Sequence, residues 1–261
     1  MMTEPLIQIS GVTKVFDHGG QSVYALKDVD LSIGEGEFVT IVGPSGCGKS
    51  TMLNLLGGLD FPSSGLVSVD GHPVTAPGPD RGVIFQQYAL FPWLTVRKNV
   101  EFGLRVAGVP RQQRRELAMQ SLRLVDLEDF ADSLPKTLSG GMKQRCAIAR
   151  AYAVSPELLL MDEPFGALDA LTRVRMQSSL LDTWQRERKT VVFITHDVDE
   201  AVFLADRVVV MGPRPGHIVK VIDVDLPRPR DERVRDSEQF QQVRSVVWND
   251  VYYHEEQKEK S

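Results

Sequence analysis

Residues 38–51 read Phe-Val-Thr-Ile-Val-Gly-Pro-Ser-Gly-Cys-Gly-Lys-Ser-Thr. The first five residues form an apolar run that favours a buried strand, and the remainder fits G-x-x-x-x-G-K-S, which is typical of a phosphate-binding loop between a strand and a helix. Glycines allow the backbone N–H groups of such a loop to point at phosphate oxygens, and the following helix begins at an end that attracts anions. We therefore expect Lys49 to lie near the β- and γ-phosphates and Ser50 to offer a hydroxyl to Mg²⁺. The residues that this loop predicts as nucleotide contacts are Gly43, Pro44, Ser45, Gly46, Cys47, Gly48, Lys49, Ser50 and Thr51.

Composition narrows the class of protein. The chain has 261 residues, 42% of them hydrophobic and 25% charged, which is ordinary for a globular protein. A net charge of −5 argues against nucleic-acid binding as the main role. The two cysteines, Cys47 and Cys146, do not suggest a disulfide, because one lies inside the phosphate loop. We find neither a membrane-spanning apolar run nor a signal peptide, so any work at a membrane is expected to proceed by docking onto another chain.

Apolar runs alternate with helical patterns along the chain, which favours an α/β fold. Continuous apolar runs predict strands buried on both faces, as in a parallel sheet, at 38–42, 83–85, 158–161, 191–194 and 208–211. Alternating patterns predict half-buried strands at 6–9, 29–33 and 66–69. The expected fold is a phosphate-loop NTPase (RecA-like) core with an antiparallel β subdomain and an inserted helical subdomain.

Residues of about 96–154 interrupt the alternation and predict that helical subdomain, with helices at 110–125 and 139–154. Met142, Cys146, Ala149 and Ala153 share one face of the second helix. We place the core domain at 1–228 and a charged tail at 229–261. Part of the tail has helical spacing, in Phe240, Val243, Val247 and Val251, and its end at 254–261 is expected to fray.

Two further segments carry chemistry. Asp162 and Glu163 end the apolar run 158–161, and carboxylates at the end of a buried parallel strand suit Mg²⁺ binding by Asp162 and general-base catalysis by Glu163. Ser139 is a natural helix N-cap, and Gly140 and Gly141 behind it let a phosphate approach the positive helix end.

Together these segments resemble the ATP-binding cassette (ABC) ATPases over residues 6–220. The string Leu138-Ser-Gly-Gly-Met-Lys-Gln144 is specific to that family among phosphate-loop proteins. Gln86 is similar to the family's Q-loop glutamine, Ala167-Leu-Asp169 to its D-loop and His196 to its switch histidine. The neighbouring Gln87 is the alternative to Gln86, and the order after Val83-Ile-Phe85 favours Gln86.

This resemblance implies a shared site. Two cassettes, a homodimer or a pair of different chains, would pack head-to-tail and hold each ATP between the phosphate loop of one and Ser139, Gly140, Gly141 and Gln144 of the other. By the same resemblance Gln86 contacts Mg²⁺ or the attacking water, His196 contacts the γ-phosphate, and Asp169 crosses the dimer interface. Adenine should stack on an aromatic ring near the N-terminus; Phe16 fits the family position, and Tyr24 is the rival.

Other strings resemble the importer ATPases for nitrate, sulfonate, taurine and similar small anions. These strings are 77–82, 89–95, 164–172, 214–216 and 224–230. That resemblance implies a peripheral subunit at the cytoplasmic face of the membrane that powers a separate permease and serves a substrate-binding protein indirectly. Residues 88–93 then either receive a short helix of the permease or pack in the core.

Three other classes of protein are alternatives to an importer ATPase. A DNA-repair or chromosome ATPase of this family would carry long inserted coiled coils, and a translation type would hold two cassettes. A single-cassette assembly or regulatory ATPase stays open, and co-purification with a membrane protein would separate it from an importer. A non-hydrolytic ATP-binding module is disfavoured by Lys49, Asp162, Glu163 and His196.

Overall fold

The computed structural model describes residues 5–259, except the side chains of His18 and of residues 253–259. Its central sheet has the strand order β10-β9-β3-β8-β7-β6. The strands from β9 to β6 are parallel, and β10 runs antiparallel to β9. Their bounds are β3 Phe38–Val42, β6 Arg81–Ile84, β7 Leu158–Asp162, β8 Thr190–Ile194, β9 Arg207–Met211 and β10 Ile218–Asp223.

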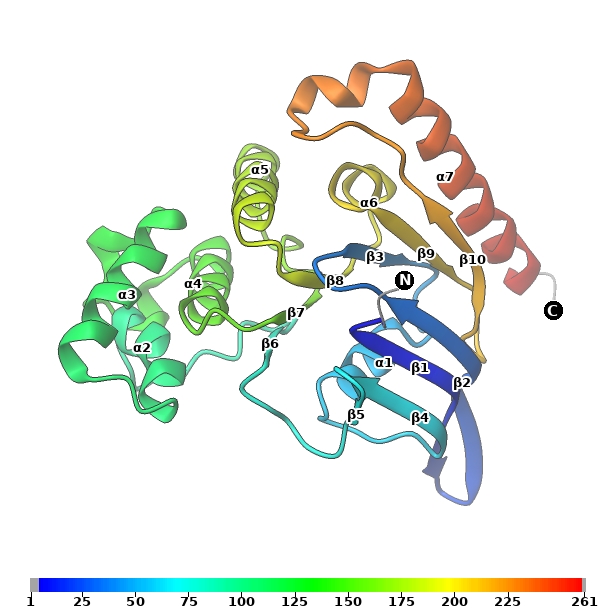
Figure 1. The fold of residues 1–261 in the computed structure, drawn as a ribbon, viewed down its shortest axis with the longest axis horizontal. Coiled ribbons are helices and arrows are strands. Elements are labelled where there is room, and N and C mark those ends of the chain that lie inside the picture. Colours follow the sequence, from blue (N-terminus) through cyan, green and yellow to red (C-terminus); the bar gives the residue numbers. More distant parts are fainter. Residues whose placement is uncertain (1–4, 260–261) are drawn as a thin grey trace.

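Helices lie on both faces of this sheet, as Figure 1 shows. Strands covered on both faces have no side in contact with water, which is why their sequences are continuous apolar runs. Every residue of β3 and of β8 is buried. The predicted α/β fold is confirmed, and strand 38–42 has the predicted bounds. The helices that surround the sheets are α1 Lys49–Leu56, α2 Val96–Val106, α3 Arg111–Leu124, α4 Gly140–Ala153, α5 Ala170–Glu187, α6 Val198–Leu204 and α7 Glu238–Glu259.

A second, antiparallel sheet has the order β2-β1-β4-β5 and covers α1. Its strands are β1 Ile7–His18, β2 Gln21–Ile33, β4 Ser64–Val69 and β5 His72–Pro73. β1 and β2 are much longer than the runs 6–9 and 29–33 suggest, because their pairing continues to a tight turn at His18 and Gln21. Three shifts of register between positions 9 and 15 break the period-two pattern that would have marked the outer half of this hairpin.

The helices α2, α3 and α4 form the helical subdomain on one side of the core (Figure 1). Cys146, Ala149 and Ala153 are buried and Met142 packs beside them, so the predicted face of α4 is confirmed. The buried Asn99 of α2 ties the preceding segment to this subdomain. Its Nδ2 donates to the carbonyls of Phe91, Leu94 and Thr95, and its Oδ1 accepts from the Phe91 N–H.

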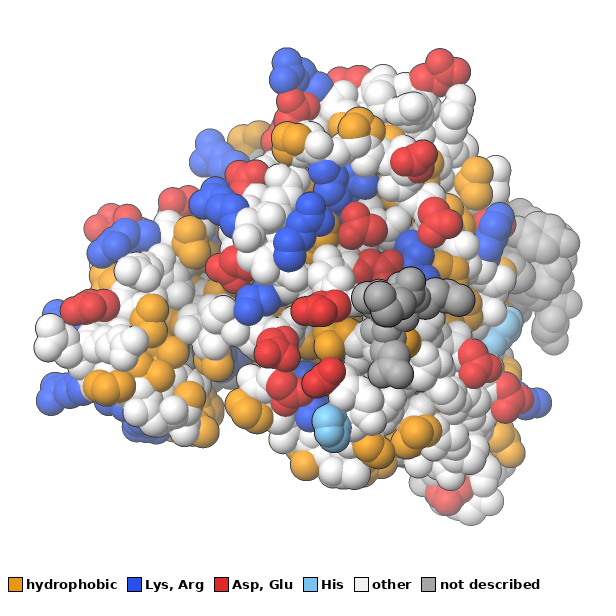
Figure 2. Space-filling model, viewed as in Figure 1, with side chains coloured by type: hydrophobic (Ala, Val, Ile, Leu, Met, Phe, Trp, Pro, Cys, Tyr) orange, Lys and Arg blue, Asp and Glu red, His pale blue; other side chains and the backbone are white. Residues whose placement is uncertain are grey.

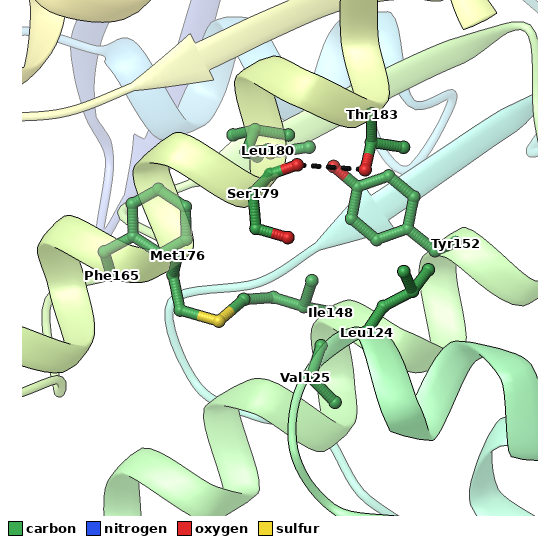
Figure 3. Close-up of a pocket in the computed structure, with 10 residues that line it drawn as sticks. Leu124, Val125, Ile148, Tyr152, Phe165, Met176, Ser179, Leu180 and Thr183 are labelled. Atoms are coloured by element: carbon green, nitrogen blue, oxygen red, sulfur yellow. Dashed lines mark hydrogen bonds between the residues drawn. The ribbon is translucent and has the colours of Figure 1, made fainter. Parts of the chain in front are cut away.

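The helical subdomain meets the core across an apolar contact between α4 and α5. Figure 3 shows a small cavity there, of about 10 Å³, lined mainly by aliphatic and aromatic side chains. The Tyr152 hydroxyl is buried at this contact without a hydrogen-bond partner among the described residues, and burial raises the pKa of Tyr152. Apolar packing rather than hydrogen bonding therefore dominates around this cavity.

The C-terminal segment packs on the outer face of the sheet beside α6 (Figure 1). Phe240 and Val247 of α7 are fully buried, and Val243 and Val251 pack against the same core, which confirms the helical spacing. Arg230 is 6% exposed and donates to the carbonyls of Val202, Phe203, Ala205, Val224 and Leu226. Burial lowers its pKa to about 10. The side chains of the expected frayed end, 254–261, lie outside the described residues.

Among the described residues, we find no helix with the length and hydropathy needed to cross a bilayer.

Candidate functional site

The phosphate loop joins β3 to α1 and requires glycine at defined points. Gly48 has a φ of 98°, and a Cβ there would lie 2.7 Å from Leu26 Cδ2 and 2.8 Å from the Ala25 carbonyl oxygen. At Gly43 a Cβ would lie 2.5 Å from the carbonyl oxygen of Met211. The Lys49 ammonium donates to the carbonyls of Gly43, at 2.7 Å, and Pro44, at 3.1 Å, so it lies across the loop. The loop is thus a backbone cradle with a cation at its centre.

The parallel sheet brings three predicted residues together at one edge. Glu163 directly follows β7, Gln86 follows β6 and His196 follows β8, so all three leave the carboxyl ends of neighbouring strands. Gln86 Nε2 donates to Glu163 Oε2 at 3.2 Å, and His196 Nδ1 lies 3.4 Å from the same oxygen. His196 is 67% exposed, whereas Glu163 is 21% exposed. Glu163 is therefore the central member of a polar cluster that opens to solvent.

Asp162 lies on the inner side of this edge, at the end of β7. Burial raises the pKa of its carboxyl, and the neighbouring Glu163 raises it further, while a hydrogen bond with Ser50 and the charge of Lys49 act in the opposite direction. The partly buried Asp162 carboxylate and the Ser50 hydroxyl beside it are a suitable pair of oxygen ligands for Mg²⁺. A bound cation would offset the burial of Asp162, which supports the fit between these residues and that metal.

Glu163 has a left-handed backbone, with φ of 45°. This conformation costs a residue with a Cβ about 1–2 kcal/mol. It persists because the Glu163 N–H donates to the Ile194 carbonyl at 3.0 Å, while its own carbonyl accepts from Gly166 at 3.1 Å. Strained residues held by their surroundings are concentrated at functional sites.

A cleft of about 550 Å³ lies between the phosphate loop and the hairpin of β1 and β2. Its lining consists of Phe16, Val23, Ala25, Ser45, Gly46, Gly48, Lys49, Ser50, Thr51, Gln86, Glu163 and Arg214. Pro44 continues the same loop, and Cys47 is only 1% exposed, with burial raising the pKa of its thiol.

Strand pairing distinguishes the two aromatic candidates. Phe16 is opposite Val23 and Val15 is opposite Tyr24 in the hairpin, so Phe16 and Tyr24 belong to opposite faces of the sheet. Phe16 and Val23 line the cleft, and the 38% exposed Phe16 ring has the Lys14 ammonium 4.8 Å from its centroid. The face that carries Phe16 is the one available to a base bound in this cleft.

The Ser139 string lies outside this cleft. The Ser139 hydroxyl accepts from the Met142 N–H at 3.3 Å and caps α4, so its exposed helix start has the predicted form. Gly140 and Gly141 form the first turn behind it, and Gln144 is 1% exposed with an unpaired Nε2 among the described residues.

Asp169 also caps a helix, α5. It accepts from the Thr172 N–H at 3.0 Å, and this hydrogen bond lowers the pKa of the Asp169 carboxyl. Asp169 and the Ser139 string line no part of the cleft, so one copy of the chain brings together only part of the predicted set.

Arg214 also lines the cleft, although the sequence marked it only through the string 214–216. Its place depends on the turn between β9 and β10, which packs against the phosphate loop. The sequence shows an arginine in a turn rich in proline and glycine, but it does not indicate that this turn would lie against the phosphate loop.

Comparison with known proteins shows the family to which the chain belongs. A family profile described as ABC transporter matches residues 26–166. The chain belongs to the ABC transporter ATP-binding family. It is 63% identical over 254 residues to a putative ATP-binding protein of Brucella abortus, covering 97% of this chain and 96% of that protein. It is 52% identical over 221 residues to the nitrate import ATP-binding protein NrtD of Synechocystis, covering 85% and 83% respectively.

Among solved structures, the chain is similar to the ATP-binding cassette MJ0796 in a dimeric post-hydrolysis state bound to ADP and Pi. The TM-score is 0.77 at 38% identity, covering 85% of this chain and all of that one. The chain is therefore an ATP-hydrolysing cassette of the ABC family, as its motifs predicted.

Proposed function

We propose that this cassette powers import of a small anion such as nitrate, sulfonate or taurine through a separate permease, with an anion-binding protein acting indirectly. It would work as a peripheral subunit at the cytoplasmic face of the membrane. The similarity to a nitrate import ATP-binding protein supports this class of transported substrate. The observation that carries the mechanism is that Lys49 and Glu163 line one cleft while the Ser139 helix start lies outside it.

Two copies arranged head-to-tail would complete the site. The positive N-terminus of α4 attracts anions, and among the described residues it lines no part of the cleft that contains the phosphate loop. A second copy would place Ser139, Gly140 and Gly141 over the nucleotide held by the first, with Gln144 supporting that turn and Asp169 at the interface. ATP then stabilises the dimer because it binds both surfaces.

Within each half-site the residues divide the work. The loop from Gly43 to Thr51 and Lys49 bind the phosphates, and Phe16 stacks on adenine. Glu163 accepts a proton from the attacking water through the oxygen that Gln86 and His196 contact, and His196 also faces the γ-phosphate. Mg²⁺ would be held by Ser50, Asp162 and Gln86 and would neutralise charge on the β- and γ-phosphates.

Glu163→Gln tests this assignment. The amide keeps the side chain's shape but cannot accept the proton, so the variant should bind ATP, lose nearly all turnover and shift from monomer to dimer with ATP in light scattering. Ser139→Arg is the matched control at the other surface, because it should block the dimer and leave ATP binding by the monomer intact. Full turnover by Glu163→Gln would refute the general-base role. Loss of monomer binding in Ser139→Arg would refute the shared site.

A groove beside the site suits the permease. It has a volume of about 830 Å³ between the core and the helical subdomain, with Phe85, Phe91, Phe102 and Val106 in its lining. Figure 2 shows hydrophobic side chains gathered over the helical subdomain, and Val106 is 74% exposed. An apolar groove of this form accepts a short amphipathic helix. Phe85 precedes Gln86, so an occupant would lie one residue from the cluster around Glu163.

Val106→Glu should therefore abolish co-purification with a co-expressed permease while the ATPase activity of the isolated cassette stays the same. Val246→Glu on α7 is the control, because Val246 is 42% exposed on an element remote from the groove. Equal loss with both variants would argue against docking at the groove. Unchanged co-purification with both variants would also argue against docking at this groove, whereas failure of the unaltered cassette to co-purify with any permease would favour the alternative of an assembly or regulatory ATPase.

A further inference from the structure

The turn between β9 and β10 is fixed against the phosphate loop. Its ends are joined by the Gly212 N–H, which donates to the His217 carbonyl at 2.9 Å. Gly216 is bonded to β2 on both sides, since its N–H donates to the Ala25 carbonyl at 3.0 Å and its carbonyl accepts from the Lys27 N–H at 2.9 Å. A Cβ on Gly216 would lie 1.9 Å from the Cys47 carbonyl oxygen, so the two backbones are in contact.

Arg214 extends from this fixed turn into the cleft that holds the phosphate loop. Its Nη2 lies 3.8 Å from the position of a Cβ on Gly46. Arg214 is exposed, and its guanidinium makes neither a hydrogen bond nor an ion pair with any of the described side chains or backbone groups. An unpaired guanidinium carried by a fixed turn beside a cradle of backbone N–H groups is available to an anion.

Lys49, the other cation that lines the cleft, has its ammonium group already hydrogen-bonded. The Lys49 ammonium already donates to the Gly43 and Pro44 carbonyls and is 9% exposed, whereas Arg214 keeps all its donors. A guanidinium binds phosphate through two parallel N–H groups, which an ammonium cannot do. The cleft lining thus contains one enclosed point charge and one open fork-shaped cation.

We propose that Arg214 is a second phosphate-binding cation of the nucleotide site, contacting the ATP polyphosphate beside Gly46 of the phosphate loop. The proposal rests on the proposed function, because it requires that the nucleotide lies in this cleft. It adds to the loop a contact supplied by the turn between β9 and β10. Arg214 acts on binding, and Glu163 remains the residue that takes the proton.

The test measures the Kd of ATP by calorimetry, in EDTA and then with Mg²⁺, for the full chain and four variants. Arg214→Ala should weaken binding about tenfold or more, the loss expected for a charge-assisted hydrogen bond. Arg214→Lys should recover part of it, since the charge returns without the fork. Arg111→Ala, which removes an exposed arginine from the remote helix α3, should leave the Kd unchanged. Lys49→Ala reports whether the cleft is the nucleotide site at all.

Salt gives a second readout, because the wild-type Kd should rise more steeply with KCl than that of Arg214→Ala. Binding by Arg214→Ala within twofold of wild type, while Lys49→Ala binds poorly, overturns the proposal and leaves the proposed function standing. The same holds if Arg214→Ala binds ATP normally but fails to dimerise, which would assign Arg214 to the partner cassette. Unimpaired ATP binding by Lys49→Ala, or no ATP binding by the wild type, would overturn both the role of Arg214 and the proposed function.

Discussion

Phe240→Ala should reveal whether the C-terminal segment is part of the folding unit of the cassette. Phe240 is fully buried between α7 and the core, and Val247 lies two turns further along the same face. Truncation of a buried phenylalanine to alanine removes apolar contacts and leaves a cavity, at a cost of about 3–5 kcal/mol. We expect the free energy of unfolding to fall by that amount, provided that α7 unfolds together with the sheet.

A helix α7 that unfolds separately from the sheet would limit the stability that Phe240→Ala can remove. If α7 can leave the core while the sheet stays folded, the measured loss cannot exceed the free energy that holds α7 in place. Phe193→Ala supplies the reference, because Phe193 is fully buried in the central strand β8 and cannot leave without the core. Equal losses for the two variants would mean one cooperative unit.

Urea unfolding followed by circular dichroism measures both variants. With a slope of about 3 kcal/mol per molar urea, a loss of 3–5 kcal/mol lowers the midpoint by about 1–1.7 M. Val246→Ala is the control on the same helix; Val246 is 42% exposed, and the change should alter stability by less than about 0.5 kcal/mol. A loss below about 1 kcal/mol in Phe240→Ala, with the full loss in Phe193→Ala, would refute the integrated tail.

Three further outcomes are expected. Burial raises the pKa of Glu200 above its ordinary value of 4.5, so the stability due to its protonation is complete below pH 4.5 and is lost as the pH rises through the pKa of the folded state. Glu200→Gln should therefore flatten the pH dependence of the free energy of unfolding over that interval, as measured by urea titrations at several pH values, and an unchanged profile would contradict this expectation. Burial raises the pKa of Cys146 to about 12, so a thiol reagent at pH 8 should label Cys146 only after unfolding, which mass spectrometry of the modified peptide would detect. Gly48→Ala should lower the melting temperature more than Gly71→Ala. Both positions have a positive φ that strains alanine, but only a Cβ at Gly48 would clash with a neighbour, at 2.7 Å from Leu26 Cδ2. Equal decreases in melting temperature would show that the backbone strain alone matters.

Much of the candidate site follows from local sequence. The phosphate loop needs glycines where the backbone turns left-handed or touches a neighbour, and Gly43 and Gly48 do both. The run 158–161 is apolar enough to predict a buried parallel strand, so the sequence alone places Asp162 and Glu163 at its carboxyl end. Ser139 is an N-cap in the structure as its residue type and following glycines indicate.

The sequence was less informative where pattern and pairing disagree. Register shifts between Ile9 and Val15 interrupt the alternation in β1, so no continuous period-two pattern predicted the full length of the β1–β2 hairpin. The same hairpin decides which aromatic ring faces the cleft, and this depends on the pairing of Phe16 with Val23. Helical spacing predicted α7, but not the buried Arg230 whose hydrogen bonds to the end of α6 fix the segment before it.

The sequence by itself determined the chemistry and the family, because phosphate binding depends on backbone freedom and on residue types within a few positions of one another. Only the tertiary structure decided which distant residues meet. Gln86, Glu163 and His196 converge because parallel strands end at one edge of the sheet, and Arg214 reaches the cleft because a turn between β9 and β10 packs on the phosphate loop. Such contacts arise from the order of strands in the sheet and from the packing of loops, and neither leaves a period or a motif in the chain.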